Sequence, residues 1–336
     1  MTAPSSSSAP GPAGSDATVE TVRGPVPLER LGRVLMHEHV FIADMEIRQN
    51  YPATWGDDEA RIDAAVAKLD ELKALGIDTV VDLTVLGLGR DIPRLARVAA
   101  RTAMQIIVAT GLWTIDVLPR FFDHRTAALA GGTDPMVEMF VTDIDEGIAE
   151  TGVRAAILKC TTDEHGVDPG IERVLRAVAQ AHLRTGVPIS THTHAPTRRG
   201  LEQQKIFVEE GVDLTRVIIG HSGDTTDLGY LQEVADAGSY LGMDRFGIDA
   251  LVPMEERVAT VAELCRRGYA GRMVLSHDAS CYNHHLPEEI LAVATPRWHY
   301  RHIPEDVLPA LRAAGVTEAQ IDQMLVDNPK EIFSRR

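Results

Sequence analysis

The sequence predicts a (β/α)8 TIM barrel, an α/β fold in which parallel strands and helices alternate, and three observations predict it. From residue 33 onward, short apolar runs alternate with amphipathic helical segments. Glycine follows several of the helical segments shortly before the next apolar run, and glycine at that place is a common helix stop. No Pro- or Ser-rich linker divides residues 30–330, so we expect a single (β/α)8 domain over residues 18–336.

The apolar runs are the expected strands of the barrel, because short apolar runs bounded by turn signals are consistent with buried strands. They span residues 33–37, 78–83, 105–110, 155–159, 187–192, 216–221, 238–243 and 272–277. The clearest helical segments lie between them, and their apolar residues recur at intervals of three and four. These segments span residues 59–75, 171–184 and 255–267, and the helix-stop glycines are Gly76, Gly186, Gly211 and Gly268.

A doubly wound open sheet is the alternative architecture. Such a sheet carries a Gly-x-Gly-x-x-Gly motif or a phosphate loop after its first strand, and neither follows residues 33–37. The segment at residues 86–90 has two glycines, but it follows the second expected strand and lacks the third glycine. The barrel is therefore the preferred fold.

The bulk composition restricts the class of protein. A hydrophobic fraction of 44% is typical of a packed globular chain, and no apolar run reaches the length of a membrane span. The formal net charge of −16 argues against a nucleic acid or an anionic membrane as partner, and we interpret it as a source of solubility. Cys160, Cys265 and Cys281 have no paired spacing, so we expect a reduced, cytoplasmic protein.

The first 17 residues differ in composition from the rest of the chain. Residues 1–17 are rich in Ser, Pro, Ala and Gly. They lack both the basic region and the apolar region of a signal peptide. We therefore expect a disordered leader.

Two histidines end the first expected strand, in the segment Val34-Leu35-Met36-His37-Glu38-His39. Residues two apart along a strand point to the same side, so His37 and His39 share one face. Two imidazoles on one face can hold a divalent metal ion and leave other positions open for water. The alternative is two polar residues at a strand end, without a metal.

Other strand ends carry residues of the same kind. The chemistry of a barrel lies at the C-terminal ends of its strands. His192 and His221 end the fifth and sixth expected strands, Asp278 follows the eighth, and Lys159 ends the fourth. Four imidazoles and an aspartate exceed what one zinc ion needs, which favours two metal ions that share a bridging oxygen.

Lys159 needs a separate explanation. It ends a buried apolar run, where an unpaired ammonium is costly, and a positive charge beside two metal ions would be repelled. A lysine paired with a nearby acid is the alternative. The physics of the residues alone leaves this choice open.

Seven motifs together resemble the phosphotriesterase-like lactonases, which belong to the binuclear branch of the amidohydrolase superfamily. The resemblance runs from about residue 18 to Phe333, and the order and spacing of the motifs make it specific. The motifs are MHEHVF (36–41), ATGLW (109–113), ILKC (157–160), THTHA (191–195), IGHSGD (219–224), GMDRFG (242–247) and LSHDA (275–279).

The resemblance implies a barrel with two divalent metal ions and a lysine that carbon dioxide has carboxylated. Lys159 becomes a carbamate that bridges both ions. The resemblance also implies that His37, His39 and Asp278 bind the more buried ion, and that His192 and His221 bind the more exposed one. A hydroxide between the ions attacks the substrate, and Asp278 accepts or relays its proton. Zinc is the expected metal, although iron, cobalt and manganese suit these ligands.

The resemblance also marks two further candidates for the reaction. Asp224 matches a family position that is associated with proton relay, and its alternative is an N-terminal cap for a helix over 225–237. Arg245 matches an arginine that is typical of the lactonase branch, where the phosphotriesterases proper carry histidine. Its alternative is a salt bridge with Asp244 or another nearby acid. The family is commonly dimeric, so a homodimer is expected.

Substrate contacts are expected from Trp113, Arg245 and Cys281. In the family, the long segment 279–304 forms the channel for an acyl chain, which makes Cys281 a candidate; ordinary loop packing is the alternative. Trp113 departs from the pattern, because the lactonases usually carry tyrosine there and the phosphotriesterases carry tryptophan. It could favour bulky phosphotriesters, or simply pack at the wall of the site. Neither His194 nor the pair His284–His285 is expected to bind metal.

The sequence leaves three functions open. The first is a lactonase for N-acyl homoserine lactones or related lactones, with promiscuous phosphotriesterase activity. The second is a dedicated organophosphate phosphotriesterase, which Trp113 favours and Arg245 opposes. The third is a non-catalytic metal-binding barrel, which the complete set of ligand candidates makes remote.

Overall fold

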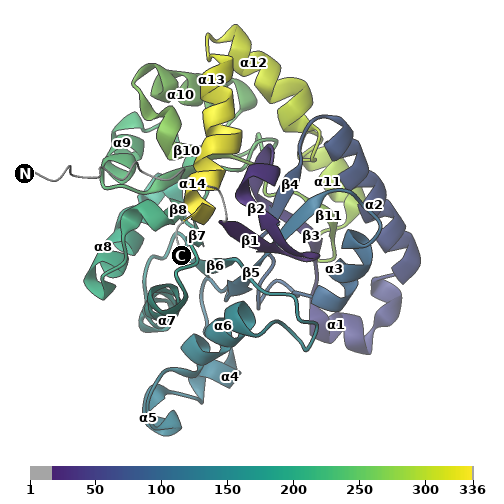
Figure 1. Cartoon of the computed structure of the whole chain (residues 1–336), viewed down its shortest axis with the longest axis vertical. Coiled ribbons are helices and arrows are strands. Elements are labelled where there is room, and N and C mark those ends of the chain that lie inside the picture. Colours follow the sequence, from purple (N-terminus) through teal and green to yellow (C-terminus); the bar gives the residue numbers. More distant parts are fainter. Residues whose placement is uncertain (1–16, 335–336) are drawn as a thin grey trace, which may run out of the picture.

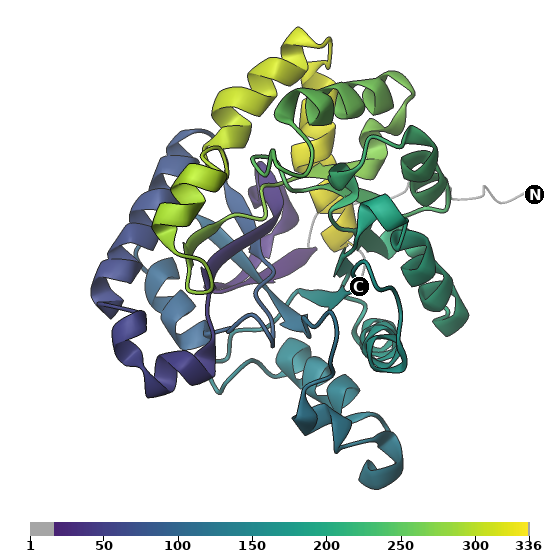
Figure 2. The same cartoon turned by 180° about the vertical axis from the view of Figure 1, so that it is seen from behind.

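A curled sheet forms the centre of the computed structural model, which describes residues 17–334. All neighbouring strands in it run parallel, in the order β10-β9-β8-β7-β6-β5-β4-β3-β11. Helices surround the sheet, so the α/β fold is TIM-barrel-like (Figures 1 and 2). The strands are β3 (Val34–Ile42), β4 (Thr79–Asp82), β5 (Gln105–Gly111), β6 (Ile157–Thr161), β7 (Ile189–His192), β8 (Val217–Ile219), β9 (Tyr240–Met243), β10 (Met273–Leu275) and β11 (Ser280–Asn283).

Every strand expected from an apolar run is present, as β3 to β10. The sequence did not predict β11, which lies in the segment after Asp278 and pairs with β3. Its residues are Ser-Cys-Tyr-Asn, so no apolar run marks it. The backbone N–H of Asp278 donates to the His37 carbonyl at 3.0 Å, and the N–H of His39 donates to the Ala279 carbonyl at 2.9 Å. The segment after β10 thereby lies against β3.

The expected helical segments 59–75, 171–184 and 255–267 are present as α2, α7 and α10. Asp57 caps α2 and Asp168 caps α7, because each carboxylate accepts a backbone N–H of the first turn. Gly186 and Gly211 end α7 and α8 with positive φ, as expected for helix-stop glycines. The longer helices are α2 (Asp58–Ala74), α3 (Ile92–Ala99), α6 (Pro135–Asp145), α7 (Pro169–Thr185), α8 (Gly200–Glu210), α9 (Leu228–Asp236) and α10 (Met254–Arg266).

Shorter helices complete the outer layer and the C-terminal part of the chain. They are α1 (Met45–Asn50), α4 (Arg120–Asp123), α5 (Ala127–Ala130), α11 (Glu288–Ala294), α12 (Leu308–Ala313), α13 (Glu318–Asp322) and α14 (Asn328–Ser334). No helix within residues 17–334 combines the length and the apolar character that crossing a membrane requires. The expected leader, residues 1–17, lies outside the described residues except for Ala17.

Two apolar clusters hold the fold together. The larger one lies between the sheet and the surrounding helices. The smaller one fills the interior of the sheet, where strand residues such as Val34 and Ile157 meet Ile332 and Phe333 of α14. An unexpected hairpin, β1 (Thr18–Thr21) and β2 (Gly24–Pro27), lies beside α14 at this end (Figure 1). The N-terminal end of the sheet is thus closed by apolar side chains, and the C-terminal ends of the strands remain for a site.

Candidate metal centre

All six residues expected to bind metal line one cavity of about 280 Å³ at the C-terminal ends of the strands. His37 and His39 come from β3, Lys159 from β6 and His192 from β7. His221 directly follows β8, and Asp278 follows β10. The side chains that the sequence predicted at separate strand ends are therefore brought together.

Three of these residues converge on a single point. The Nε2 atoms of His37 and His39 lie 3.2 Å and 3.0 Å from Oδ1 of Asp278. Nζ of Lys159 lies 2.9 Å from Nε2 of His37. Two imidazole nitrogens and a carboxylate oxygen at such separations form a donor set that suits zinc and similar divalent ions.

A second pair of nitrogens lies nearby. Nδ1 of His192 and Nε2 of His221 are 2.9 Å apart, and both rings are buried. Burial lowers the pKa of His192 to about 4 and the pKa of His221 well below its ordinary value. Both imidazoles are therefore neutral near pH 7, and each keeps a nitrogen lone pair that a metal ion can accept.

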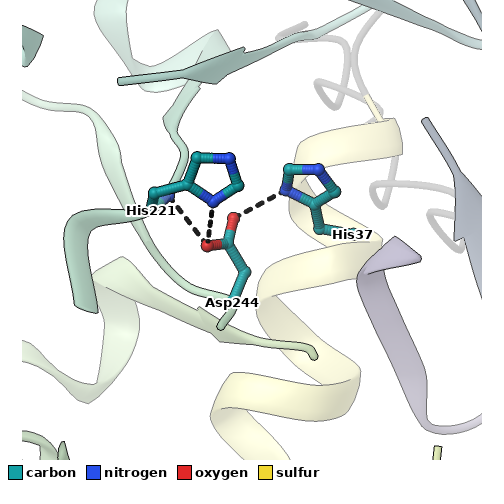
Figure 3. A group of neighbouring side chains, drawn as sticks. All are labelled: His37, His221 and Asp244. Carbon is teal, nitrogen blue, oxygen red and sulfur yellow. Dashed lines mark hydrogen bonds and ion pairs between the residues drawn. The ribbon is translucent and has the colours of Figure 1, made fainter. Parts of the chain in front are cut away.

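Asp244 fixes the orientation of two of the histidines (Figure 3). Its Oδ2 accepts a hydrogen bond from Nδ1 of His37 at 2.8 Å, and its Oδ1 accepts one from Nδ1 of His221 at 2.9 Å. With a proton on Nδ1, each ring directs the unprotonated Nε2 into the cavity. His37, His221 and Asp244 could themselves hold a metal ion by proximity alone. These hydrogen bonds instead make Asp244 a support for the two histidines.

The remaining histidines have supports of their own. Nδ1 of His39 pairs with Oγ1 of Thr84 at 2.8 Å. Nε2 of His192 lies 3.4 Å from Oδ2 of Asp163, and hydrogen bonding to His192 lowers the pKa of Asp163 to about 2. Sequence reasoning missed Asp163 and Asp244. The only sequence signal for Asp244 was its place in the GMDRFG motif beside Arg245.

The surroundings of Lys159 leave its amine without an acid partner. Its side chain is buried, and no ion pair with a carboxylate is found for it within residues 17–334. Its Nζ contacts Nε2 of His37 and the carbonyl of Thr191 instead. Burial lowers the pKa of Lys159 to about 8 and outweighs the attraction of Asp278 and Asp244 for its proton. A buried amine that readily loses its proton fits carboxylation better than the alternative of a lysine–acid pair.

Arg245 and Asp224 form a charged pair beside the cluster. Nε of Arg245 donates to Oδ2 of Asp278 at 2.9 Å, and Nη1 donates to Oδ2 of Asp224 at 3.0 Å. Arg245 lines the cavity, whereas Asp224 does not. Burial alone would raise the pKa of Asp278, but His37, His221 and Arg245 hold it well below the ordinary value.

The structure also tests the alternative roles of Arg245 and Asp224. Arg245 does form salt bridges, as its alternative expected, but with the nearby acids Asp278 and Asp224. Asp244 instead binds His37 and His221. The helix cap expected at Asp224 lies instead at Asp227, whose side chain accepts the N–H of Tyr230 at the start of α9. Asp224 is buried, and its two carboxylate oxygens accept hydrogen bonds from Arg257 and Arg245.

The expected substrate contacts are not all at the cavity. Trp113 lines the cavity, with its ring perpendicular to that of His192. Cys281 does not, because its Sγ points to the Ala65 carbonyl of α2 and the hydroxyl of Tyr300. It lines a separate cavity of about 310 Å³, and burial raises its pKa to about 12. We therefore remove Cys281 from the substrate-binding set.

Other residues of the same segment take its place. Asn283, His285, Leu286 and Trp298 line the site cavity together with Trp113. Among the histidines set aside as ligands, His285 is thus part of the wall. His194 is not in this wall, and its Nδ1 pairs with Oγ1 of Thr197. The sequence did not show that residues 280–283 form a strand, so which of their side chains line the cavity could not be foreseen.

Two of the ligand candidates have unusual backbone conformations. His221 and Asp278 both adopt φ of 57°, in the left-handed region. Non-glycine residues in sparsely populated conformations cost roughly 1–3 kcal/mol and gather at functional sites. At each of these two positions the backbone turn directs the side chain into the cavity at the strand ends.

Comparison with known proteins identifies the family. The model of the phosphotriesterase family matches residues 17–333. The chain belongs to the phosphotriesterase family. Members of this family generally depend on two bound metal ions, and His37, His39 and Asp278 form a group that could hold a metal ion.

Close relatives extend over nearly the whole chain. The phosphotriesterase homology protein of Mycobacterium tuberculosis (strain H37Rv) is 61% identical and covers 95% of this chain and 98% of its own length. The aryldialkylphosphatase of Saccharolobus solfataricus is 38% identical, with 90% of this chain and 95% of that protein covered. A structure of the phosphotriesterase from Mycobacterium tuberculosis matches with a TM-score of 0.93 at 60% identity, covering 95% of this chain and 98% of the other.

Proposed function

We propose that the chain is a metal-dependent hydrolase that opens lactone rings, with weaker activity on phosphotriesters. The substrates are N-acyl homoserine lactones or related lactones. The observation that carries this proposal is the guanidinium of Arg245, which lines the cavity and binds Oδ2 of Asp278. An arginine at this place is the feature by which the sequence resembles the lactonase branch.

The donor groups divide into two sets that fit two metal ions. His37, His39 and Asp278 would hold one ion, and His192 and His221 would hold the other. A carboxylated Lys159 would be shared by both. Two divalent ions in such a site act as Lewis acids and lower the pKa of bound water toward neutrality. Zinc is the proposed metal, and iron, cobalt or manganese would also suit these ligands.

The residues of the chain have separate roles in the proposed reaction. Asp278 would receive the proton of the attacking water, because its Oδ1 lies beside the nitrogens of His37 and His39 that would hold a metal ion. Arg245 stabilises the negative charge that develops on the substrate oxygen. Its neighbours Asp278 and Asp224 outweigh burial and raise its pKa, so Arg245 stays protonated and does not pass protons onward. Asp224 therefore serves to hold Arg245.

A dedicated organophosphate phosphotriesterase is the second candidate function. Trp113 lines the cavity and offers an apolar wall with a single N–H donor, which suits a bulky phosphotriester. The relative from Saccharolobus solfataricus is named an aryldialkylphosphatase. The expected homodimer stays a prediction.

A comparison of two substrates tests the proposal. The purified chain is reconstituted with zinc, and kcat/KM is measured for a long-chain N-acyl homoserine lactone and for an aryl dialkyl phosphate. We expect the lactone to have the higher value. A higher value for the phosphate would favour the second candidate. Hydrolysis of neither substrate, with metal bound, would contradict both.

A further inference from the structure

Arg257 is a buried arginine that the proposed reaction does not use. It lies on α10, its side chain is 1% exposed, and it does not line the site cavity. Its guanidinium donates to the carbonyls of Val252 at 3.0 Å, Gly223 at 2.6 Å and Ile248 at 3.4 Å. Nη2 also donates to a carboxylate, Oδ1 of Asp224, at 2.7 Å. This last contact connects Arg257 to the site.

Asp224 divides its carboxylate between two arginines. Oδ1 accepts from Arg257, and Oδ2 accepts from Nη1 of Arg245. Arg245 in turn donates from Nε to Asp278. The side chains form a row of alternating charge, Arg257–Asp224–Arg245–Asp278, which leads from α10 to the cavity.

This row leaves one nitrogen of Arg245 for another partner. Within residues 17–334, no hydrogen bond involves Nη2 of Arg245, and the side chain is 19% exposed in the cavity wall. A carboxylate with both oxygens free tends to bind a guanidinium through two parallel hydrogen bonds. Such a fork on Arg245 would engage a second nitrogen. In the structure Oδ1 of Asp224 faces Arg257 and only Oδ2 contacts Arg245, so the fork is not formed.

We propose that Arg257 is a positioning residue for the reaction. By holding one oxygen of Asp224, it keeps Nη2 of Arg245 available for a hydrogen bond to an oxygen of the bound substrate, on a carbonyl or a phosphoryl group, a bond that is already made before the reaction begins. The inference rests on the proposed function, because it needs Arg245 to face the substrate. It assigns a role to a residue that contacts neither substrate nor metal.

The first test replaces Arg257 and separates KM from kcat. In Arg257→Met, Asp224 is free to bind Arg245 with both oxygens. We expect KM for the better substrate to rise about tenfold, the size of one charged hydrogen bond, while kcat falls less than about threefold. Arg257→Lys supplies a charge for Asp224 but cannot hold the three carbonyls. KM in Arg257→Lys should lie within about threefold of wild type, whereas a purely structural role would make Lys and Met alike.

The second test is a double-mutant cycle with Asp224. Asn at position 224 carries no negative charge and cannot form the carboxylate fork. We therefore expect Arg257→Met to add little to the KM of Asp224→Asn. Independent, additive effects of the two substitutions would overturn the inference.

Arg216 provides a matched control for the loss of a buried arginine. Its guanidinium donates to the carbonyls of Ile332 at 2.6 Å and Gly186 at 2.9 Å, at the other end of the sheet from the cavity. Arg216→Met should lower the thermal unfolding midpoint without changing KM. A rise in KM equal to that of Arg257→Met would show that destabilisation alone explains the effect.

A measurement without turnover decides the inference independently of the proposed function. The Nε–H nuclear magnetic resonance signal of Arg245 is assigned by its loss in Arg245→Met. It should shift in Arg257→Met and stay in place in Arg216→Met. An unchanged signal in Arg257→Met would overturn the inference, even if wild type hydrolyses neither substrate. Failure of hydrolysis with a shifted signal would instead contradict only the proposed function.

Discussion

Burial determines the chemistry of the individual residues at the site. It lowers the pKa of the buried His192 and His221, so these rings stay neutral at pH 7. It also lowers the pKa of Lys159 from 10.5 to about 8. A neutral amine reacts with carbon dioxide to form a carbamate and release a proton, whereas an ammonium does not. The protonation of Lys159 would therefore control whether the proposed bridging carbamate can form.

Carboxylation of Lys159 should follow the pH through the lowered pKa. The neutral fraction of an amine grows as the pH rises. At pH 7 a pKa of about 8 leaves about one amine in ten neutral, against about one in 3,000 for an ordinary lysine. With metal-free protein and a constant concentration of dissolved ¹³CO₂, we expect the carbamate signal of Lys159 in carbon nuclear magnetic resonance to increase steeply from pH 6.5 to about 8.5, because loss of the ammonium proton and formation of the carbamate each release a proton.

Lys159→Arg is the control for this measurement, because a guanidinium stays protonated and forms no carbamate. The signal should be absent in that variant at every pH. A carbamate signal that is constant from pH 6.5 to 9, or that persists in Lys159→Arg, would contradict the assignment.

Sequence reasoning at this scale reached the ligand candidates but not their supports. His37, His192 and Asp278 could be predicted because a strand end and a metal-binding side chain are both visible in the sequence. Asp163 and Asp244 could not, because their effect depends on which ring nitrogen each one faces. Asp244 alone contacts His221, which is 23 positions away, and His37, which is 207 positions away.

Asp244 connects the ends of separate strands. It follows β9 and binds His37 of β3 and His221 after β8, so one carboxylate sets the ring orientation for both proposed metal ions. Asp163 follows β6, and among the ligand candidates in residues 17–334 its carboxylate contacts His192 alone. Substitution of Asp244 would therefore remove a histidine support at both proposed ions, whereas substitution of Asp163 would remove one at a single ion.

Asp244→Asn should weaken both metal sites. An amide has one oxygen acceptor, so it cannot accept a hydrogen bond from both Nδ1 atoms as the carboxylate does. Loss of such a support typically lowers metal affinity ten- to a hundredfold. We expect both ions to dissociate at a lower chelator concentration than in wild type, as measured by metal content after equilibration.

Asp163→Asn is the comparison for that experiment, since it alters the support of His192 alone. It should weaken one ion and leave the other at its wild-type affinity. If Asp244→Asn retained both ions as tightly as wild type, the supporting role of Asp244 would be wrong.

At the scale of elements, the regular barrel units could be predicted and the irregular ones could not. The strands β3 to β10 and the helices α2, α7 and α10 follow from apolar periodicity and from glycine stops. The hairpin β1–β2 and strand β11 are short and polar, and they form because the curled sheet offers them an edge to pair with or a face to cover. Tertiary contacts, not local pattern, create these elements.

The site forms only when the two ends of the chain meet. Asp278 and His39 are 239 positions apart, yet Oδ1 and Nε2 of these residues are separated by 3.0 Å. At the opposite end of the sheet, α14 packs Ile332 and Phe333 into the interior cluster, and Asn328 binds the carbonyls of Ala270 and Met273. The last helix thus fixes β10, the strand that directly precedes Asp278.

Ile332→Ala should destabilise the fold without changing the chemistry of the site. Ile332 is fully buried in the interior cluster, and replacing a buried isoleucine with alanine costs about 2–5 kcal/mol. Its side chain lies at the end of the sheet opposite the cavity. We expect the urea midpoint of unfolding to fall by the corresponding amount, while kcat and KM of the folded, metal-loaded protein stay within about twofold of wild type.

The same variant tests whether the fold is one cooperative unit. If the sheet unfolds as one unit, metal release and the change in tryptophan fluorescence on unfolding should have the same urea midpoint. Both midpoints should fall together in Ile332→Ala. Val293→Ala on α11 is the matched control, because Val293 is 83% exposed and its truncation removes no buried contact. Metal release that kept its wild-type midpoint in Ile332→Ala would show that the site survives without the α14 end of the sheet.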